Sequence, residues 1–464
     1  MRKAILSAVL LTLLFGGRTV ADDWPQWRGP NRDGKSAETG LLKQWPEAGP
    51  TLVWSSTNCG IGYGAPSTAD GRVYVMGNGE NGKEWVTCLD EKTGKQLWAC
   101  TTGRIHSTGG GYPGPRCTPT VADGRVYVAG LAGRVISCDA KTGQPFWKRE
   151  MTKELGGKEP TWGYAESVLV DGGRVICTPG MEKTVVALDA KTGQEVWAAK
   201  AGDPASYSSL VKANYGETPQ YVAFTLRGLV GIRAADGAIL WRYDAPSNGQ
   251  VNCATPLVVG SSVFAASSYG KGGGCALIQK DASGAFNAKQ VYFTTKMQNL
   301  HGGYVFADGH LYGCCDPGVL VSLTYKTGVL ARAAHTGRFS IAYADGMIYA
   351  RNEDGRMDLY EASPTNLVRR STFEQPNRTT AKAWAHPVIA NGHLYLRDQY
   401  LLLCYDIRGE QTKPAPDEKP AAKPEAGPPA GETPAAEPAV EKPATKPAVD
   451  KPATKPEGEK PAAP

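Results

Sequence analysis

Arginine, histidine and aromatic residues recur at one position of a repeated sequence unit, where they could bind a ligand. In most units this position lies eight residues before the glycine of a recurring Asp-Gly or Asn-Gly pair. Arg and His bind anionic groups through charge-assisted hydrogen bonds, and aromatic rings stack on planar groups. The set predicts a pocket or partner surface for an anionic or planar ligand, or a channel that these residues only fill by packing. Together with two close neighbours, the candidates are Tyr63, Arg116, Trp162, Tyr164, His301, Arg338, Trp384 and His386.

Side chains for catalysis are sparse at the same position. No carboxylate occupies it in any unit, and the nearest one in the sequence is Glu166. The chain has no Cys-x-x-Cys-His haem signature, no His cluster at metal-ligand spacing and no Gly-rich phosphate loop. Scattered Ser, His and Asp residues do not define a catalytic triad. From the residues alone we expect no catalytic residue, no metal site and no cofactor.

Eight copies of one unit supply the elements that must position these candidates. The clearest marker is an apolar strand, an Asp-Gly turn and a second strand, as at residues 70–75 and 123–128. The copies are spaced about 37 to 53 residues apart, and each can form four antiparallel strands. One such sheet cannot bury both faces alone, so the sheets must pack around an axis. The sequence predicts an all-β, eight-bladed propeller over residues 51–408.

A second marker is a hairpin that reads Ala-x-Asp-x-x-Thr-Gly-x-x-x-Trp and is intact at residues 187–197. Its glycine allows the positive φ that closes such a turn. The eighth unit lacks a fourth strand, so we expect residues 51–54 to supply it and close the ring. Units five to seven lose the pattern, and Arg332 stands where unit six should have its Trp. The tryptophans expected to dock between blades are Trp54, Trp98, Trp147, Trp197 and Trp241.

Both ends of the chain differ from the repeats. Residues 1–21 combine a charged start, a short apolar run and a small residue before Asp22, which predicts a secretory signal peptide and a periplasmic or extracellular location. Residues 22–50 contain Trp, Pro and Gly and predict an extended segment pinned to the propeller by its indoles. Residues 409–464 are rich in Pro, Ala, Lys and Glu, which predicts a disordered tail that acts as a spacer or a tether.

Charge and cysteine content limit the partners. The net charge is +6, much of the lysine lies in the tail, and no basic stripe with interleaved aromatics predicts nucleic-acid binding. No segment predicts a transmembrane helix, because the N-terminal apolar run is too short. The eleven cysteines of an exported chain can form disulfides, and the odd number leaves at least one unpaired. Their spacing gives no connectivity, and the sequence does not predict the oligomeric state.

The hairpin at residues 187–197 resembles the tryptophan-docking motif of quinoprotein dehydrogenase propellers. It is also similar to the repeats of the propeller lipoprotein in the bacterial outer-membrane β-barrel assembly machinery. The segments at residues 24–34 and 397–406 resemble exported bacterial propellers of the pyrroloquinoline-quinone-like type. The resemblance covers about residues 22 to 408 and is specific for the fold, since the motif is structural and many such propellers bind no quinone.

Two functions follow from this resemblance. The first is a non-catalytic binding or scaffold module of the cell envelope, with envelope proteins or a small anionic or planar ligand as partners. The alternative is an oxidoreductase of alcohols or sugars that uses pyrroloquinoline quinone and Ca²⁺, for which the family needs Glu, Asn and Asp ligands and an Asp base. Quinoprotein alcohol dehydrogenases carry a vicinal disulfide. Cys314 and Cys315 offer one, although two incidental hairpin cysteines fit the pattern better.

Overall fold

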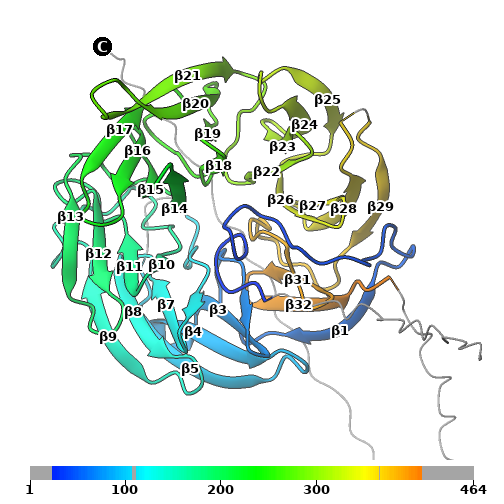
Figure 1. Ribbon diagram of the computed structural model, residues 1–464. Helices are drawn as coiled ribbons and strands as arrows, with labels where there is room; N and C mark the ends of the chain where they lie inside the picture. Colours follow the sequence, from blue (N-terminus) through cyan, green and yellow to red (C-terminus); the bar gives the residue numbers. More distant parts are fainter. Residues whose placement is uncertain (1–22, 107–110, 365, 410–464) are drawn as a thin grey trace, which may run out of the picture. The chain divides into compact units, whose positions relative to one another are not determined.

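A computed structural model describes residues 23–106, 111–364 and 366–409. The chain separates into two units, residues 1–411 and 412–464, and all described residues belong to the first. In this part of the chain, thirty-two strands form eight four-stranded antiparallel sheets arranged in a ring (Figure 1). The predicted eight-bladed propeller is therefore confirmed. The predicted signal peptide and residues 410–464 of the predicted tail lie outside the described residues.

Blades 1 to 4 each consist of four strands that are consecutive in the sequence. Blade 1 also contains a short 3₁₀ turn at Glu80–Gly82, the one helical element in the described part of the chain. Blade 1 contains β2 (Ser67–Ala69), β3 (Arg72–Asn78), β4 (Lys83–Asp90) and β5 (Gln96–Arg104), and blade 2 contains β6 (Thr120–Ala122), β7 (Arg125–Ala129), β8 (Arg134–Asp139) and β9 (Pro145–Glu150). Blade 3 contains β10 (Leu169–Asp171), β11 (Arg174–Cys177), β12 (Val185–Asp189) and β13 (Glu195–Ala199), and blade 4 contains β14 (Val211–Tyr215), β15 (Thr218–Thr225), β16 (Gly228–Arg233) and β17 (Ile239–Tyr243).

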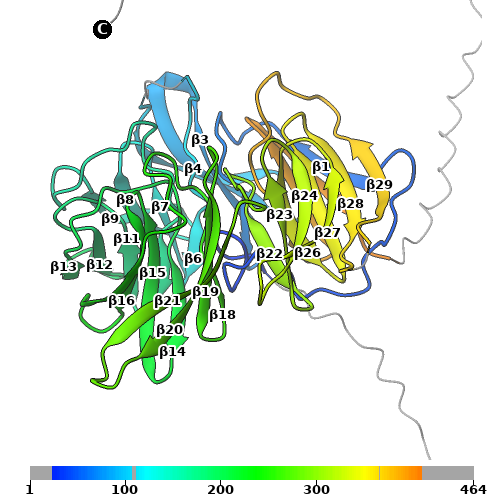
Figure 2. The ribbon, with the colours of Figure 1, turned by 90° about the horizontal axis from the view of Figure 1, so that it is seen from above.

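Blades 5 to 8 complete the ring, and blade 8 takes its fourth strand from the start of the propeller. The first strand of each blade is the innermost (Figure 1), and the strands run along the ring axis (Figure 2). Blade 5 contains β18 (Leu257–Val259), β19 (Ser262–Ser267), β20 (Gly272–Lys280) and β21 (Phe286–Thr294), and blade 6 contains β22 (Tyr304–Ala307), β23 (His310–Cys315), β24 (Val319–Thr324) and β25 (Leu330–His335). Blade 7 contains β26 (Phe339–Ala344), β27 (Met347–Asn352), β28 (Arg356–Glu361) and β29 (Arg369–Glu374), and blade 8 contains β30 (Val388–Ala390), β31 (His393–Asp398), β32 (Leu401–Asp406) and β1 (Thr51–Ser56).

Strand β1 closes the ring as predicted. It pairs antiparallel with β32, with Thr51 opposite Asp406 and Trp54 opposite Cys404. The outer strand of blade 8 is thus contributed by a segment more than 340 residues away in the sequence. This pairing covers the edge that β32 would otherwise expose.

Four of the predicted tryptophans dock on the neighbouring blade in the same way. Each indole lies over the glycine of the next Thr-Gly or Asp-Gly turn, at Gly94, Gly143, Gly193 and Gly237. Each indole N–H donates to a turn carbonyl over 2.8 to 3.3 Å: Trp54 to Glu91, Trp98 to Ala140, Trp147 to Ala190 and Trp197 to Ala234. The repeated hairpin therefore joins one blade to the next.

The pattern changes after blade 4. Trp241 is buried, but its indole N–H donates to Gln220 of its own blade over 2.7 Å, and it does not reach a turn carbonyl. Tyr292 takes the tryptophan position of blade 5 and lies over Gly328 of the next blade. Arg332 occupies that position in blade 6, as predicted, opposite Ser322.

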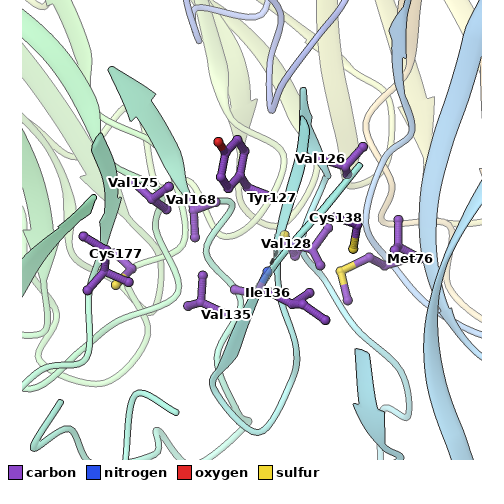
Figure 3. Packing of buried hydrophobic residues seen from close by; sticks show 14 of the residues in the cluster. Met76, Val126, Tyr127, Val128, Val135, Ile136, Cys138, Val168, Val175 and Cys177 are labelled. Atoms are coloured by element: carbon purple, nitrogen blue, oxygen red, sulfur yellow. Dashed lines mark hydrogen bonds between the residues drawn. The ribbon is translucent and has the colours of Figure 1, made fainter. Parts of the chain in front are cut away.

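The hydrophobic core lies between neighbouring blades. The largest cluster joins blades 1, 2 and 3 and contains Met76, Tyr127, Cys138 and Val175, all at most 1% exposed (Figure 3). Alternate residues of each strand point into the two inter-blade layers, so apolar residues are needed on both faces. This explains the continuous apolar runs of the second and third strands.

Residues 23–50 form an irregular segment that crosses the inner strands of the ring. Pro25 accepts a hydrogen bond from the Val121 N–H of blade 2, Arg32 donates to Ser167 of blade 3, and Arg28 donates to Tyr304 of blade 6. Further along the segment, the Trp45 ring packs against Phe373 of β29, the outer strand of blade 7. In Figure 1 the segment is the dark blue trace. We call residues 23–36 the plug, because they close one end of the central channel.

Candidate functional site

The segments that precede the innermost strands converge at the other end of the channel and line a pocket of about 460 Å³. All eight blades contribute to it, and the plug contributes its floor. The lining residues are Trp27, Tyr63, Tyr112, Arg116, Trp162, Ala165, Ser167, Tyr207, Ser209, Val251, Cys253, Tyr269, Leu300, His301, Arg338, Trp384 and His386. We call this the mouth pocket.

Seven of the eight candidate residues lie in this lining; the exception is Tyr164. Its ring is 2% exposed and packs against Gly133 of blade 2, and its hydroxyl donates to the Pro179 carbonyl over 3.0 Å. Ala165 takes the corresponding place in blade 3, and Trp162 lines the pocket from three positions earlier. Tyr164 is thus part of the packing between blades and lies outside the mouth pocket.

Aromatic rings form one wall of the mouth pocket. Trp384 lies at its centre, with ring centroids 4.8 Å from Tyr63, 4.7 Å from Tyr112 and 5.4 Å from His301. On the other side Trp162 and Tyr207 are 5.7 Å apart. Seven of the lining residues are Trp or Tyr, so the pocket offers flat apolar faces for stacking.

Arg116 brings a positive charge to this wall. Its Nη2 donates to the Tyr112 carbonyl over 3.0 Å, whereas its Nη1 is buried and has no hydrogen-bond partner among the described residues. Burial lowers the pKa of Arg116, which Tyr63, Cys253 and Tyr207 partly offset. The guanidinium remains protonated at neutral pH, so a donor and its charge are left for a ligand.

Arg338 carries the second positive charge, but carboxylates behind the lining balance it. Its Nε donates to Asp316 Oδ1 over 2.9 Å, and its Nη1 lies 3.7 Å from Glu353 Oε1. Burial would raise the pKa of Glu353, but hydrogen bonds from His301 and Trp384 outweigh it and lower the pKa to about 2. Glu353 is therefore ionised and fixes the orientation of both rings.

The floor of the pocket is built by the plug. The Trp27 ring meets His386 edge to face at 4.6 Å, and its indole N–H donates to Thr255 over 2.8 Å. His386 is 5% exposed, and burial beside Arg28 lowers its pKa to about 3. The imidazole is therefore neutral; its Nε2–H donates to the His301 carbonyl over 2.9 Å.

The repeat pattern does not predict several residues that lie in or beside the mouth pocket. Tyr207 belongs to blade 4, whose turn reads Tyr-Gly-Glu and lacks the Asp-Gly marker; aligning its Gly216 with the other turns would have pointed to residues 207–209. Glu353 comes from the hairpin between the second and third strands of blade 7, far from the repeated position. Trp27 comes from the plug, outside every repeat.

Sequence comparison identifies the family of the chain. The family model described as "Outer membrane protein assembly factor BamB" matches residues 82–333, more than half of the chain. The chain belongs to this family. A search of curated protein sequences found no matching relative.

Solved structures share the fold of this BamB-family chain. BamB from Moraxella catarrhalis has a TM-score of 0.54 at 16% identity, over 77% of this chain and 99% of that one. The quinohemoprotein alcohol dehydrogenase from Comamonas testosteroni has a TM-score of 0.60 at 14% identity, over 85% of this chain and 82% of that one. At these identities the likeness concerns the fold alone.

The donor set does not fit the calcium ion that the quinone alternative needs. Ca²⁺ takes six to eight oxygen ligands, mostly carboxylates and carbonyls. The lining of the mouth pocket has no carboxylate, and no group of three or more His, Cys, Asp or Glu that could hold a metal occurs among the described residues. The nearby carboxylates of Glu353 and Asp316 already pair with His301, Trp384 and Arg338.

The adjacent cysteines of this BamB-family chain lie close to the mouth pocket without forming a bond. Cys314 is buried, Cys315 is half-buried, and both are free thiols in this structure. Successive residues of a strand point to opposite faces, which separates the two sulfurs. Asp316 follows them and contacts Arg338, so their hairpin does reach the pocket face. In the described part of the chain, no helix is long and apolar enough to cross a membrane.

Proposed function

We propose that this protein is a non-catalytic binding module of the bacterial cell envelope, and that its mouth pocket holds a planar anionic group. The observation that carries the proposal is the unpaired Nη1 of Arg116 among stacked aromatic rings, in a lining without a carboxylate. The group could belong to a small molecule or to an envelope partner.

Electrostatics favour an anion at this site. A buried donor without an acceptor costs free energy, which a ligand oxygen would recover. Arg338 is 32% exposed but already pairs with Asp316 and Glu353, and the neutral His386 adds no charge, so Arg116 carries the preference for an anion. Hydrogen bonds between a guanidinium and an anion are about twice as strong as neutral ones, so an acidic ligand gains most.

The geometry gives little support for catalysis. A general base needs a free acceptor that the substrate can reach. His301 Nε2 is engaged by Glu353, its Nδ1 is buried, and burial raises the pKa of Cys253 to about 12, so its thiol stays protonated. The alternative, a quinone-dependent oxidoreductase, gains from the cationic and aromatic lining but lacks calcium ligands.

Two observations support an envelope location. The start of the chain reads as a secretory signal peptide. The family is described by its role in outer-membrane protein assembly, which takes place in the envelope. A propeller with a closed channel and many exposed loops is a suitable scaffold for partners there.

Replacing Arg116 with Gln should weaken the binding of an anionic planar probe about 10- to 100-fold, because one charge-assisted hydrogen bond is lost. The probe is pyrroloquinoline quinone, an aromatic tricarboxylate, titrated against the intrinsic fluorescence of the protein; Trp162 and Trp384 lie in the pocket. Arg332→Gln, on the exposed outer strand of blade 6, should leave the affinity unchanged.

The same titration separates the two functions. Binding without Ca²⁺, and without dye-linked oxidation of alcohols when Ca²⁺ is added, supports the binding module. Turnover that requires Ca²⁺ would establish the oxidoreductase and overturn the proposal. Uncharged phenanthrenequinone tests the role of charge: if it binds as tightly as pyrroloquinoline quinone, or if neither binds, the pocket is not an anion site.

A further inference from the structure

Two thiols from neighbouring blades meet outside the mouth pocket. Cys100 lies in β5, the outer strand of blade 1, and Cys138 lies in β8, the third strand of blade 2. Their sulfur atoms are 3.6 Å apart, and the Cys138 S–H donates to Cys100 Sγ. Cys138 belongs to the apolar cluster between the blades, where Figure 3 shows it with Met76 of blade 1.

The docking hairpin explains why these two residues meet. Cys100 follows Trp98 by two positions and shares its face of β5. Trp98 donates to the carbonyl of Ala140, and Cys138 precedes Ala140 by two positions. The contact that joins the blades therefore also aligns the two sulfurs.

No other docked tryptophan of the described blades brings two cysteines together. The equivalent pairs are Ser56 with Leu89, Arg149 with Leu188, and Ala199 with Ile232. All eleven cysteines are free thiols, and Cys138 with Cys100 is the one hydrogen bond between two sulfurs in the described part of the chain. The thiol pair is specific to the seam between blades 1 and 2.

The two thiols differ in a way that suits thiol–disulfide exchange. Cys100 is 7% exposed at the edge of the seam, whereas Cys138 is completely buried. The hydrogen bond from Cys138 lowers the pKa of Cys100, and the same contact raises the pKa of Cys138. Cys100 is thus the more acidic and more accessible thiol, which meets an oxidant first, and Cys138 is the thiol that resolves the product.

We propose that Cys100 and Cys138 form a disulfide bond between blades 1 and 2 when the protein meets a disulfide oxidant. The Cys100 thiolate attacks one sulfur of the oxidant and releases the other as a thiolate. Cys138 then loses its proton and attacks the Cys100 sulfur, which forms the new bond and releases the second thiolate. Two protein thiols lose two protons and two electrons, and the oxidant disulfide becomes two thiols.

The bond would tie down the wall of the mouth pocket. The two cysteines are 38 positions apart, and the chain between them carries Tyr112 and Arg116. The sulfurs need to approach by about 1.5 Å to reach bonding distance, which side-chain rotation and small strand shifts can supply. Closing a loop of this length restricts the unfolded chain, so oxidation should raise the melting temperature by about 5 °C.

The experiment uses the full chain, reduced and then incubated with oxidised glutathione. Free thiols are alkylated under denaturing conditions, and peptides are mapped by mass spectrometry; Arg104, Arg116, Arg125 and Arg134 allow trypsin to separate the two cysteines. We expect a peptide pair linked through Cys100 and Cys138 and a mass loss of two hydrogens. Cys315→Ser, which removes a half-buried thiol elsewhere, should keep both.

Cys100→Ser is the decisive variant, since it changes the less buried partner. It should fold, lose the linked peptide pair and lose the rise in melting temperature on oxidation. Full alkylation of both cysteines after oxidation would overturn the proposal, as would a bond between Cys314 and Cys315 in their place. A linked pair without any change in melting temperature would refute the proposed effect on the seam.

Discussion

Replacing Glu166 with Gln should stabilise the protein by about 3 kcal/mol at pH 8 and leave its stability unchanged near pH 4. Glu166 is 2% exposed and lies in the segment before β10. Burial raises the pKa of this carboxyl to about 7, although the Thr178 N–H and Arg32 act against the shift. One oxygen accepts the Thr178 N–H over 2.5 Å, and the other has no partner among the described residues.

The sign of the pH dependence follows from the raised pKa. Between about pH 4.5 and pH 7 the unfolded chain releases this proton while the folded chain keeps it, so folding becomes less favourable as the pH rises. Above pH 7 the folded protein carries the full cost of a buried charge. A glutamine keeps the shape and the acceptor for Thr178 but cannot ionise, so this contribution disappears.

The measurement is urea unfolding of both proteins at several pH values between 4 and 8. Other groups titrate as well, so the difference between variant and wild type is the quantity to compare. Glu47→Gln, at an exposed position, serves as the control and should show no such difference. A gain from Glu166→Gln that is the same at every pH would mean that packing, and not ionisation, causes it.

The ring was predictable because each blade repeats its own local signals. Asp-Gly-type turns and alternating apolar residues mark the eight blades, tryptophans in register reinforce the first four, and the unpaired strand ending at Trp54 supplies the missing fourth strand of the eighth. Tyr292 was missed, since its role as a docking residue depends on Gly328 of the next blade and the usual turn is absent from its own blade. Trp241 was expected to dock, but the glutamine at position 220 offers a closer acceptor.

The site was predictable to the extent that it follows the repeat. The position before the innermost strand identifies Arg116, His301, Arg338 and Trp384, because every blade brings that position to the same end of the channel. Blade 3 carries two glycines in its turn, so the repeat position shifts by one residue to Ala165, which lines the pocket, while Tyr164 packs behind it. Glu353 and Asp316, which hold the side chains of His301, Trp384 and Arg338 in place, come from hairpins on the same face. Their positions in the sequence have no fixed spacing from the residues they contact.

The position of the plug on the propeller could not be predicted from the sequence. Its tryptophans and arginines suggest attachment to the propeller, but they give no partner. Arg28 and Arg32 are 4% and 3% exposed and bind backbone carbonyls of blades 6 and 3. Since every residue offers a carbonyl, the sequence contains no complementary residue that could have predicted where each arginine docks.

Replacing Gly193 with Ala should destabilise the protein by about 3 kcal/mol, and Gly124→Ala by only about 1 kcal/mol. Both glycines have a φ of +71°, so both substitutions carry the same backbone strain. They differ in what the added Cβ meets. At Gly193 it would lie 2.6 Å from the Trp147 indole, whereas at Gly124 nothing lies within 4 Å. The difference between the two losses of stability therefore measures how much the close contact between the tryptophan and the glycine contributes.

A cycle with Trp147→Ala shows whether that difference comes from the docking contact. Without the indole, Ala at position 193 has nothing to clash with, so both glycine variants should then cost about 1 kcal/mol each. The free energies of unfolding come from urea titrations of the single and double variants. If Gly193→Ala remains the costlier change in the Trp147→Ala protein, the glycine is required by its turn alone, and the close approach of the tryptophan does not explain its recurrence in the motif.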